Sequence, residues 1–229
     1  DARKSRGLGD VYKRQILMGI FFIPFNSWSG ISFLGEYYRD SCFLFFSFAF
    51  VLTLLNKRIQ IPLNNLIFQF LILFILWSFL ATLLNAHNIL DYYFKQTTGV
   101  SRFINQFGSL IIASLIIPLT FYNGFKKTNI NDIFRLIRRV ILGSLIIAFI
   151  YSIIEILIVK LNMVYLKKPL LNLFDYFPFT EAKTDMRLQR ISSVTFEPPA
   201  LGTYLLSIAG WMFSYVLTEK NKLKYLPLI

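Results

Sequence analysis

Leu66 to Leu84 reads LIFQFLILFILWSFLATLL and carries no charged side chain across nineteen residues. Its polar members are Gln69, Ser78 and Thr82. A transmembrane helix needs roughly 20 predominantly apolar residues to cross the hydrocarbon core of a bilayer. The stretch therefore predicts a membrane-spanning helix, and it sets the expectation for the chain on either side.

The composition of the whole chain agrees with a membrane protein. Its 229 residues are 55% hydrophobic and 17% aromatic, and the mean hydropathy is +0.56. A soluble domain of this size would not contain repeated charge-free apolar runs near bilayer length. We expect an all-α polytopic transmembrane helical bundle with about six complete spans and the start of a seventh.

The predicted spans are separated by polar residues. In chain order they are Ile16 to Leu34, Ser41 to Leu55, Leu66 to Leu84, Phe103 to Tyr122, Val140 to Val159 and Pro198 to Thr218, with a seventh beginning near Tyr225. Before the fifth span, residues 126–139 alternate apolar and basic side chains at helical spacing. They predict a short amphipathic helix lying on the membrane surface.

Both ends of the sequence look incomplete. Residues 1–15, DARKSRGLGDVYKRQ, are polar, lack an initial Met and resemble translated sequencing-adapter sequence, so we exclude them from the prediction of the fold. The other end stops inside a new apolar run. We expect residues 16–229 to be the N-terminal part of one transmembrane domain in a longer protein.

The positive residues predict the orientation of the chain in the membrane. Lys and Arg gather in the loops after the second, fourth and sixth predicted spans. Cytoplasmic loops carry such an excess, so the N-terminus is predicted to be cytoplasmic. Residues 160–197 then form a long outer loop. Its Lys and Arg residues are candidates for function, because long loops cross the membrane largely regardless of charge.

Several functional classes are disfavoured. The formal net charge of +12 is better explained by anionic lipid headgroups than by nucleic acid, because no basic stripe with interleaved aromatics is present. Cys42 and His87 are the single cysteine and the single histidine, so neither a disulfide nor a zinc site is predicted. Phosphate-binding loops and hydrolase motifs are absent from the sequence, and we expect no metal and no cofactor.

One polar stretch stands out at an entrance to the membrane. Residues 190–204 read RISSVTFEPPALGTY and lead from the long outer loop into the sixth span. The simple interpretation is that Glu197 and Thr195 cap that helix, which begins at two prolines. The functional interpretation takes the residues together. Arg190 offers a fork of donors for phosphate oxygens, and Glu197 could exchange a proton with a sugar hydroxyl.

This stretch resembles the Arg-x-Ser-Gly…Glu-Pro motif of the O-antigen ligase and O-antigen polymerase family. The resemblance extends more weakly over residues 16–229. It implies a polytopic, all-helical glycosyltransferase of the bacterial inner membrane. Family members act at the outer face on glycans carried by undecaprenyl pyrophosphate, and they transfer them to a glycan or lipid acceptor during synthesis of lipopolysaccharide or related polysaccharides. The family often has glycine at the position of Ser193, and another near Thr195.

The resemblance also implies roles for individual residues. Arg190 would contact the pyrophosphate, and Glu197 would shape the acceptor or leaving-group region. Further residues are expected to bind substrate, namely Arg187, Ser192, Ser193, Thr195, Arg102 and Lys95. Glu155, an acid within the fifth predicted span, is a further functional candidate.

Two other functions remain open on the sequence. A transporter or flippase of lipid-linked oligosaccharides would also suit a basic, helical membrane protein. It predicts charged residues along the middle of several spans, where this sequence has few. A membrane scaffold without chemistry is the third possibility. Polymerase and ligase are not distinguished by the sequence.

Overall fold

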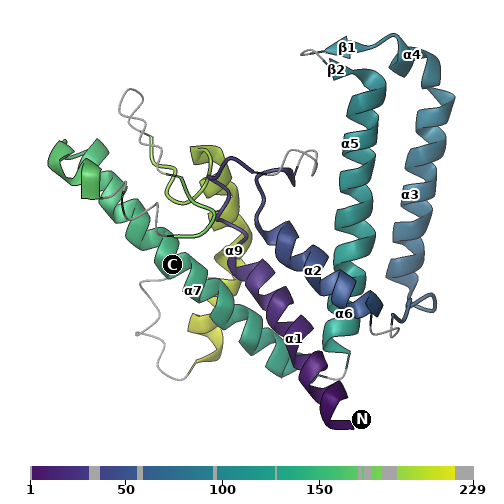
Figure 1. Ribbon diagram of the computed structural model, residues 1–229, viewed down its shortest axis with the longest axis horizontal. Coiled ribbons are helices and arrows are strands. Elements are labelled where there is room, and N and C mark those ends of the chain that lie inside the picture. The colour runs from purple at the N-terminus through teal and green to yellow at the C-terminus, as the bar shows by residue number, and fades with distance from the viewer. Residues whose placement is uncertain are drawn as a thin grey trace. The chain divides into compact units, whose positions relative to one another are not determined.

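The computed structural model describes residues 2–30, 37–55, 59–94, 97–126, 128–169, 172, 177–181 and 190–219. In this part of the chain the fold is all-α, with eight α-helices and one β-hairpin whose two strands have two residues each (Figure 1). Four helical segments are long and apolar enough to cross a membrane. They are Leu66–Leu84, Gly99–Phe125, Ile130–Val159 and Pro198–Thr218. The chain is therefore a multi-pass membrane protein by the length and composition of its helices.

The predicted boundaries of two spans are confirmed. Helix α3 covers Leu66–Leu84, and helix α9 covers Pro198–Thr218. The Asn65 side chain caps α3 by accepting a hydrogen bond from the Ile67 N–H, at 2.9 Å. Pro198 and Pro199 open α9, where the first N–H groups lack partners inside a helix anyway. Both boundaries are signalled by local chemistry, which explains why the sequence predicts them.

The chain divides into two compact units. The first contains the described residues of Asp1–Ile16, Ile31–Tyr38 and Phe46–Lys127, and the second contains those of Leu17–Gly30, Arg39–Phe45 and Thr128–Ile229. Helices α1 (Ala2–Phe21) and α2 (Cys42–Leu55) contribute residues to both units. Residues 1–15, which the sequence analysis set aside, are thus helical from Ala2 onward.

The first unit contains a long helical hairpin. Helix α3 is followed by α4 (Ala86–Leu90) and by strands β1 (Tyr93–Phe94) and β2 (Thr97–Thr98), which pair antiparallel. Helix α5 (Gly99–Ile111) then returns beside α3 (Figure 1). Most side chains of α3 are exposed. A helix that is apolar on all sides and exposed is suited to contact with lipid.

The return helix changes its winding before a proline. It continues from α5 through a π-helical segment, η2 (Ile112–Ile116), into α6 (Ile117–Phe125). Pro118 has no N–H to donate, and its ring would crowd the carbonyl four residues earlier in a regular helix. Wider π turns immediately before it relieve this crowding. The segment consequently stays one continuous run from Gly99 to Phe125.

The first two predicted spans differ from the structure. The segment from Ile16 to Leu34 is not one helix, because α1 ends at Phe21 and residues 22–30 form turns and coil. Pro24 interrupts the backbone hydrogen bonding there, and Gly30 adopts a φ of 83°. Helix α2 is apolar, but its 14 residues extend about 21 Å against a hydrocarbon core of about 30 Å. Six long spans are therefore not found among the described residues, and the predicted seventh lies outside them.

The basic segment before the fifth predicted span is also different from our expectation. A single helix, α7, runs from Ile130 to Val159 without interruption. The prediction of a separate surface helix over residues 126–139 is thus wrong. The Asn129 side chain caps α7 by accepting from the Asn131 N–H, at 3.0 Å. No proline lies within Ile130–Val159, so no helix breaker of that kind separates the basic turns from the apolar ones.

The second unit has an aromatic core on one side of α7. Phe25, Ala148, Tyr151, Ile158 and Val194 are buried together there. The Phe25 ring stacks on Phe21 with a centroid distance of 5.5 Å. Helix α9 packs against α7 through a buried hydrogen bond of 2.6 Å between the Ser144 and Tyr204 hydroxyls. This packing joins α7, the loop after α1 and the residues before α9.

We predict that Phe25→Ala will destabilise the protein by about 3–5 kcal/mol, the usual cost of removing a large buried aromatic side chain. Phe25 is 0% exposed. The control is Phe149→Ala, because Phe149 lies on α7 with 61% of its surface exposed. Thermal unfolding in detergent measures both. Equal melting temperatures for the two variants would contradict the assigned core.

Candidate functional site

Residues 190–197 form a turn whose charged ends are exposed and whose middle is buried. Arg190 and Glu197 are exposed. Between them Ser192, Ser193 and Thr195 are buried, with exposed fractions of 6%, 3% and 1%. Since a buried polar side chain needs a partner inside the protein, the contacts of these three residues define how the turn is held.

The carboxylate of Glu155 holds the buried part of the turn. It projects from α7, is 1% exposed and accepts from two successive backbone N–H groups. The distances to its Oε2 are 3.1 Å from Ser192 N and 2.7 Å from Ser193 N. The Ser192 hydroxyl donates to Oε1 at 3.4 Å. Successive N–H groups that converge on one oxygen are an anion-binding arrangement, and here the anion is a side chain of the protein itself.

Ser193 occupies a backbone conformation that favours glycine. Its φ is 55°, in the left-handed region, which costs an L-residue with a Cβ roughly 1–2 kcal/mol. Its hydroxyl compensates by donating to the Ala148 carbonyl oxygen at 2.6 Å. Glycine adopts this backbone conformation freely, so glycine at position 193 would remove the strain of the left-handed backbone.

Thr195 organises the entry into α9. Its hydroxyl lies 2.7 Å from the Ser192 carbonyl oxygen and 2.9 Å from the Glu197 carbonyl oxygen. The Thr195 N–H also donates to Ser192 O, at 3.0 Å. These bonds close the turn on itself. The hydroxyls of Ser192, Ser193 and Thr195 all have protein partners, and their predicted contact with substrate stays a prediction.

Glu197 does not cap α9 through its side chain. It stands at the N-cap position with an extended backbone, φ −156° and ψ 157°, and its carboxylate makes no capping hydrogen bond. Its backbone carbonyl instead accepts from Ala200 N at 3.1 Å. The simple interpretation of Glu197 as a side-chain cap is therefore wrong. The carboxylate remains exposed near the positive end of the helix dipole.

A loop far away in sequence supports the same turn. Asn26 is 8% exposed, and its amide oxygen accepts from the Phe196 N–H at 3.0 Å. Its amide nitrogen donates to Asp40 Oδ1 at 3.2 Å. The Arg39 guanidinium lies 5.5 Å from the centre of the Phe196 ring, within the range of a cation–π contact.

Asn26, Arg39 and Asp40 were missed as site residues by the sequence analysis. A lone asparagine in an apolar run and a short polar turn carry no motif that points to residue 196. Burial raises the pKa of the Asp40 carboxyl above its ordinary value, and the hydrogen bond from Asn26 opposes that rise. The signal that could have found Asn26 is its polarity inside the apolar run from Ile16 to Leu34.

Three further predicted site residues lie either in the first unit or outside the described residues. Arg187 and Lys95 lie outside the described residues. Arg102 is exposed on the first turns of α5 and belongs to the first unit, whereas the turn at 190–197 belongs to the second. Their predicted roles in substrate binding stay predictions. No group of three or more metal-ligating side chains is found within the described part of the chain.

The hydrogen bonds of the turn determine which of its groups are available to a ligand. Backbone donors at Ser192 and Ser193 are already used on Glu155, so a bound anion would depend on the exposed guanidinium of Arg190. The exposed carboxylate of Glu197 could accept a proton or a hydroxyl hydrogen bond.

In comparisons with known protein families, curated proteins and solved structures, no match to this chain is found.

We predict that Glu155→Ala will destabilise the second unit by about 2–5 kcal/mol, because two buried N–H groups lose a charged acceptor. Glu155→Gln will cost less, since its amide oxygen can still accept from one or both. Thermal unfolding in detergent compares the two variants. If the alanine variant were as stable as the wild-type protein, the Glu155 contacts would not hold the turn.

At position 193 we expect glycine to be tolerated better than alanine. Both substitutions remove the hydroxyl bond to Ala148, but alanine keeps the strain of the left-handed backbone. Ser193→Gly should therefore unfold at a higher temperature than Ser193→Ala, by the equivalent of roughly 1 kcal/mol. The reverse order would show that residue 193 does not adopt a positive φ in the folded protein.

Proposed function

We propose that the chain is part of a bacterial inner-membrane glycosyltransferase that polymerises or ligates undecaprenyl-pyrophosphate-linked glycans at the outer face of the membrane. The observation that carries the proposal is the turn at residues 190–197. It presents Arg190 and Glu197 at the surface and buries residues 192–195 between them. The motif resemblance supplies the substrate class, and the positive-residue pattern supplies a cytoplasmic N-terminus.

The proposed reaction is a direct transfer between a lipid-linked donor and an acceptor hydroxyl. The acceptor oxygen forms a bond to the anomeric carbon of the donor glycan. The bond from that carbon to the pyrophosphate oxygen breaks, and the electron pair leaves with the undecaprenyl pyrophosphate. The hydroxyl proton passes to a base. Glu197 is proposed to receive or orient this proton.

Arg190 is proposed to stabilise the leaving group. Negative charge grows on the bridging pyrophosphate oxygen as the bond breaks, and an arginine placed there lowers the barrier. A guanidinium is suited to this role because its planar donors match two phosphate oxygens at once. Its position on a turn held by buried hydrogen bonds supports the proposal, since catalytic groups act best from a rigid backbone.

The burial of Glu155 favours the enzyme over a flippase. A flippase would need ionisable side chains that face an aqueous path through the spans. Glu155 is 1% exposed, and its carboxylate is bound to the Ser192 and Ser193 N–H groups. It is therefore engaged in holding the turn rather than open to a path.

We predict that Arg190→Ala in the complete protein will lower glycan product by about 10²–10³-fold, the usual effect of removing one transition-state electrostatic contact. Gel analysis of the glycan and quantification of released carrier lipid measure it. The control is Lys168→Ala, another exposed cation in the segment between α7 and α9, which should keep normal product. Normal product from the arginine variant at normal expression would remove Arg190 from the mechanism. Translocation of the glycan by the wild-type protein without release of carrier lipid would instead identify a flippase.

A further inference from the structure

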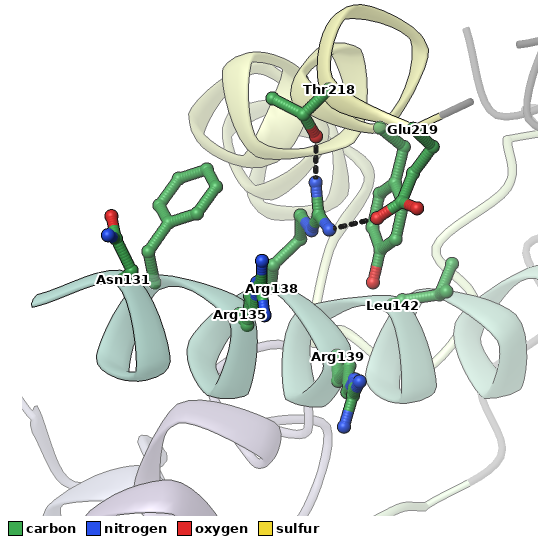
Figure 2. A pocket seen from close by; sticks show the side chains of 9 residues that line it. Asn131, Arg135, Arg138, Arg139, Leu142, Thr218 and Glu219 are labelled. Atoms are coloured by element: carbon green, nitrogen blue, oxygen red, sulfur yellow. Dashed lines mark hydrogen bonds and ion pairs between the residues drawn. The ribbon is translucent and has the colours of Figure 1, made fainter. Parts of the chain in front are cut away.

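A second polar site lies at the opposite end of α7 from Glu155. A cavity of about 830 Å³ opens where the first turns of α7 face the last turns of α9. Its polar lining includes Arg135, Arg138, Arg139, Thr218 and Glu219 (Figure 2). Phe134, Leu142 and Tyr215 supply apolar surface. All of these residues belong to the second unit.

Arg138 is the fixed centre of this cavity. It is 5% exposed and reaches from α7 to α9 (Figure 2), where it donates to the Thr218 hydroxyl at 2.6 Å and pairs with Glu219 at 2.5 Å. Its guanidinium carbon lies 3.9 Å from the centre of the Tyr215 ring. Within the described part of the chain, its buried Nε has no hydrogen-bond partner.

A buried donor without a partner normally costs free energy. The Nε–H of Arg138 is therefore left without a hydrogen bond, at a site where positive charge exceeds negative charge. Among the described residues that line the cavity, three are arginines and one, Glu219, carries a carboxylate. Arg135 and Arg139 are exposed and stand four residues apart, so they share one face of α7. The site is consequently suited to an anion with several acceptor oxygens.

The length of α7 places this site at the level of lipid headgroups. The helix has 30 residues and extends about 45 Å, whereas about 20 residues suffice to cross the hydrocarbon core. If the charge-poor turns from Val140 to Val159 fill the core, the turns that hold the three arginines project beyond it. Arginines at this depth meet phosphates rather than acyl chains.

We propose that the cavity between the ends of α7 and α9 binds the phosphate of an anionic membrane lipid. Arg135 and Arg139 contact the phosphate oxygens at the rim, and the buried guanidinium of Arg138 adds positive charge behind them. Phe134 and Leu142 pack against the glycerol and the first acyl carbons. The mixture of guanidinium groups and apolar side chains favours a lipid over a soluble anion. This site is independent of the glycosyltransferase proposal.

The test measures lipid binding to the chain of residues 1–229 in neutral detergent. Native mass spectrometry and thermal unfolding are followed during titration with phosphatidylglycerol, and phosphatidylcholine serves as the neutral lipid. The test variant is Arg135→Gln/Arg139→Gln, whose exposed side chains can be changed without removing the Arg138 contacts. The matched control is Lys160→Gln/Lys168→Gln, which removes two exposed cations beyond the other end of α7.

We expect the wild-type chain to prefer phosphatidylglycerol and to unfold at a higher temperature in its presence. The arginine variant should weaken this binding by about 10- to 30-fold, as expected for the loss of two arginines near anionic phosphate. The lysine variant should bind within about twofold of wild type, because these cations lie outside the cavity. Equal binding of the two lipids, or equal losses in the two variants, would overturn the proposal.

A separate arm distinguishes a lipid from a free anion. Inorganic phosphate at 10 mM, an excess of roughly 10⁴-fold over a site with a Kd of about 1 μM, is added to the wild-type chain in place of lipid. The lipid proposal predicts little stabilisation, because phosphate alone cannot fill the apolar part of the cavity. Stabilisation as large as that from phosphatidylglycerol would show a site for soluble phosphate and would overturn the lipid assignment.

Discussion

The hydrogen bonds from Ser192 N and Ser193 N to the Glu155 carboxylate are the contacts on which the second unit depends. They bring an ionisable carboxyl group inside the protein and at the same time satisfy two backbone donors that no helix or strand uses. A buried carboxylate without such donors would be costly, and buried N–H groups without an acceptor would be costly as well. Each therefore stabilises the other. The positive φ of Ser193 is a consequence of turning two N–H groups toward one oxygen.

Within this short turn, some residues fix the backbone through buried hydrogen bonds and others are exposed at the surface. Ser192, Ser193 and Thr195 use their hydroxyls inside the protein, and Asn26 ties the following residue to the loop after α1. Arg190 and Glu197 are left exposed at the two ends. A substrate with a pyrophosphate and a hydroxyl would need such charged groups on a backbone that does not move. In this structure the hydroxyls of Ser192, Ser193 and Thr195 bind other protein groups and stabilise the turn.

Helix α7 carries a buried ionisable side chain toward each end, and the two side chains find their hydrogen-bond partners in different ways. Glu155 is surrounded by backbone donors of the turn before α9. Arg138 meets Thr218 and Glu219 at the far end of α9 and rests on the Tyr215 ring. Both contacts fasten α7 to the segment that contains α9, and the Ser144–Tyr204 hydrogen bond lies between them. One helix pair thus positions both the candidate catalytic turn and the proposed lipid site.

The sequence by itself determined the class of the protein and the limits of its clearest helices. A charge-free run near bilayer length and a pair of prolines that opens a helix need no distant partner, so the sequence predicts α3 and α9 at their observed residues. The sequence also indicates residues 190–204 as a polar stretch at a membrane entrance that contains candidate functional residues. Tertiary structure decided the remainder. Which donors reach Glu155, and which residue Asn26 binds, depend on contacts between residues far apart in the chain, such as Asn26 with Phe196. Periodicity and composition cannot encode those pairings, because they report what a residue prefers locally and not which partner the fold brings to it.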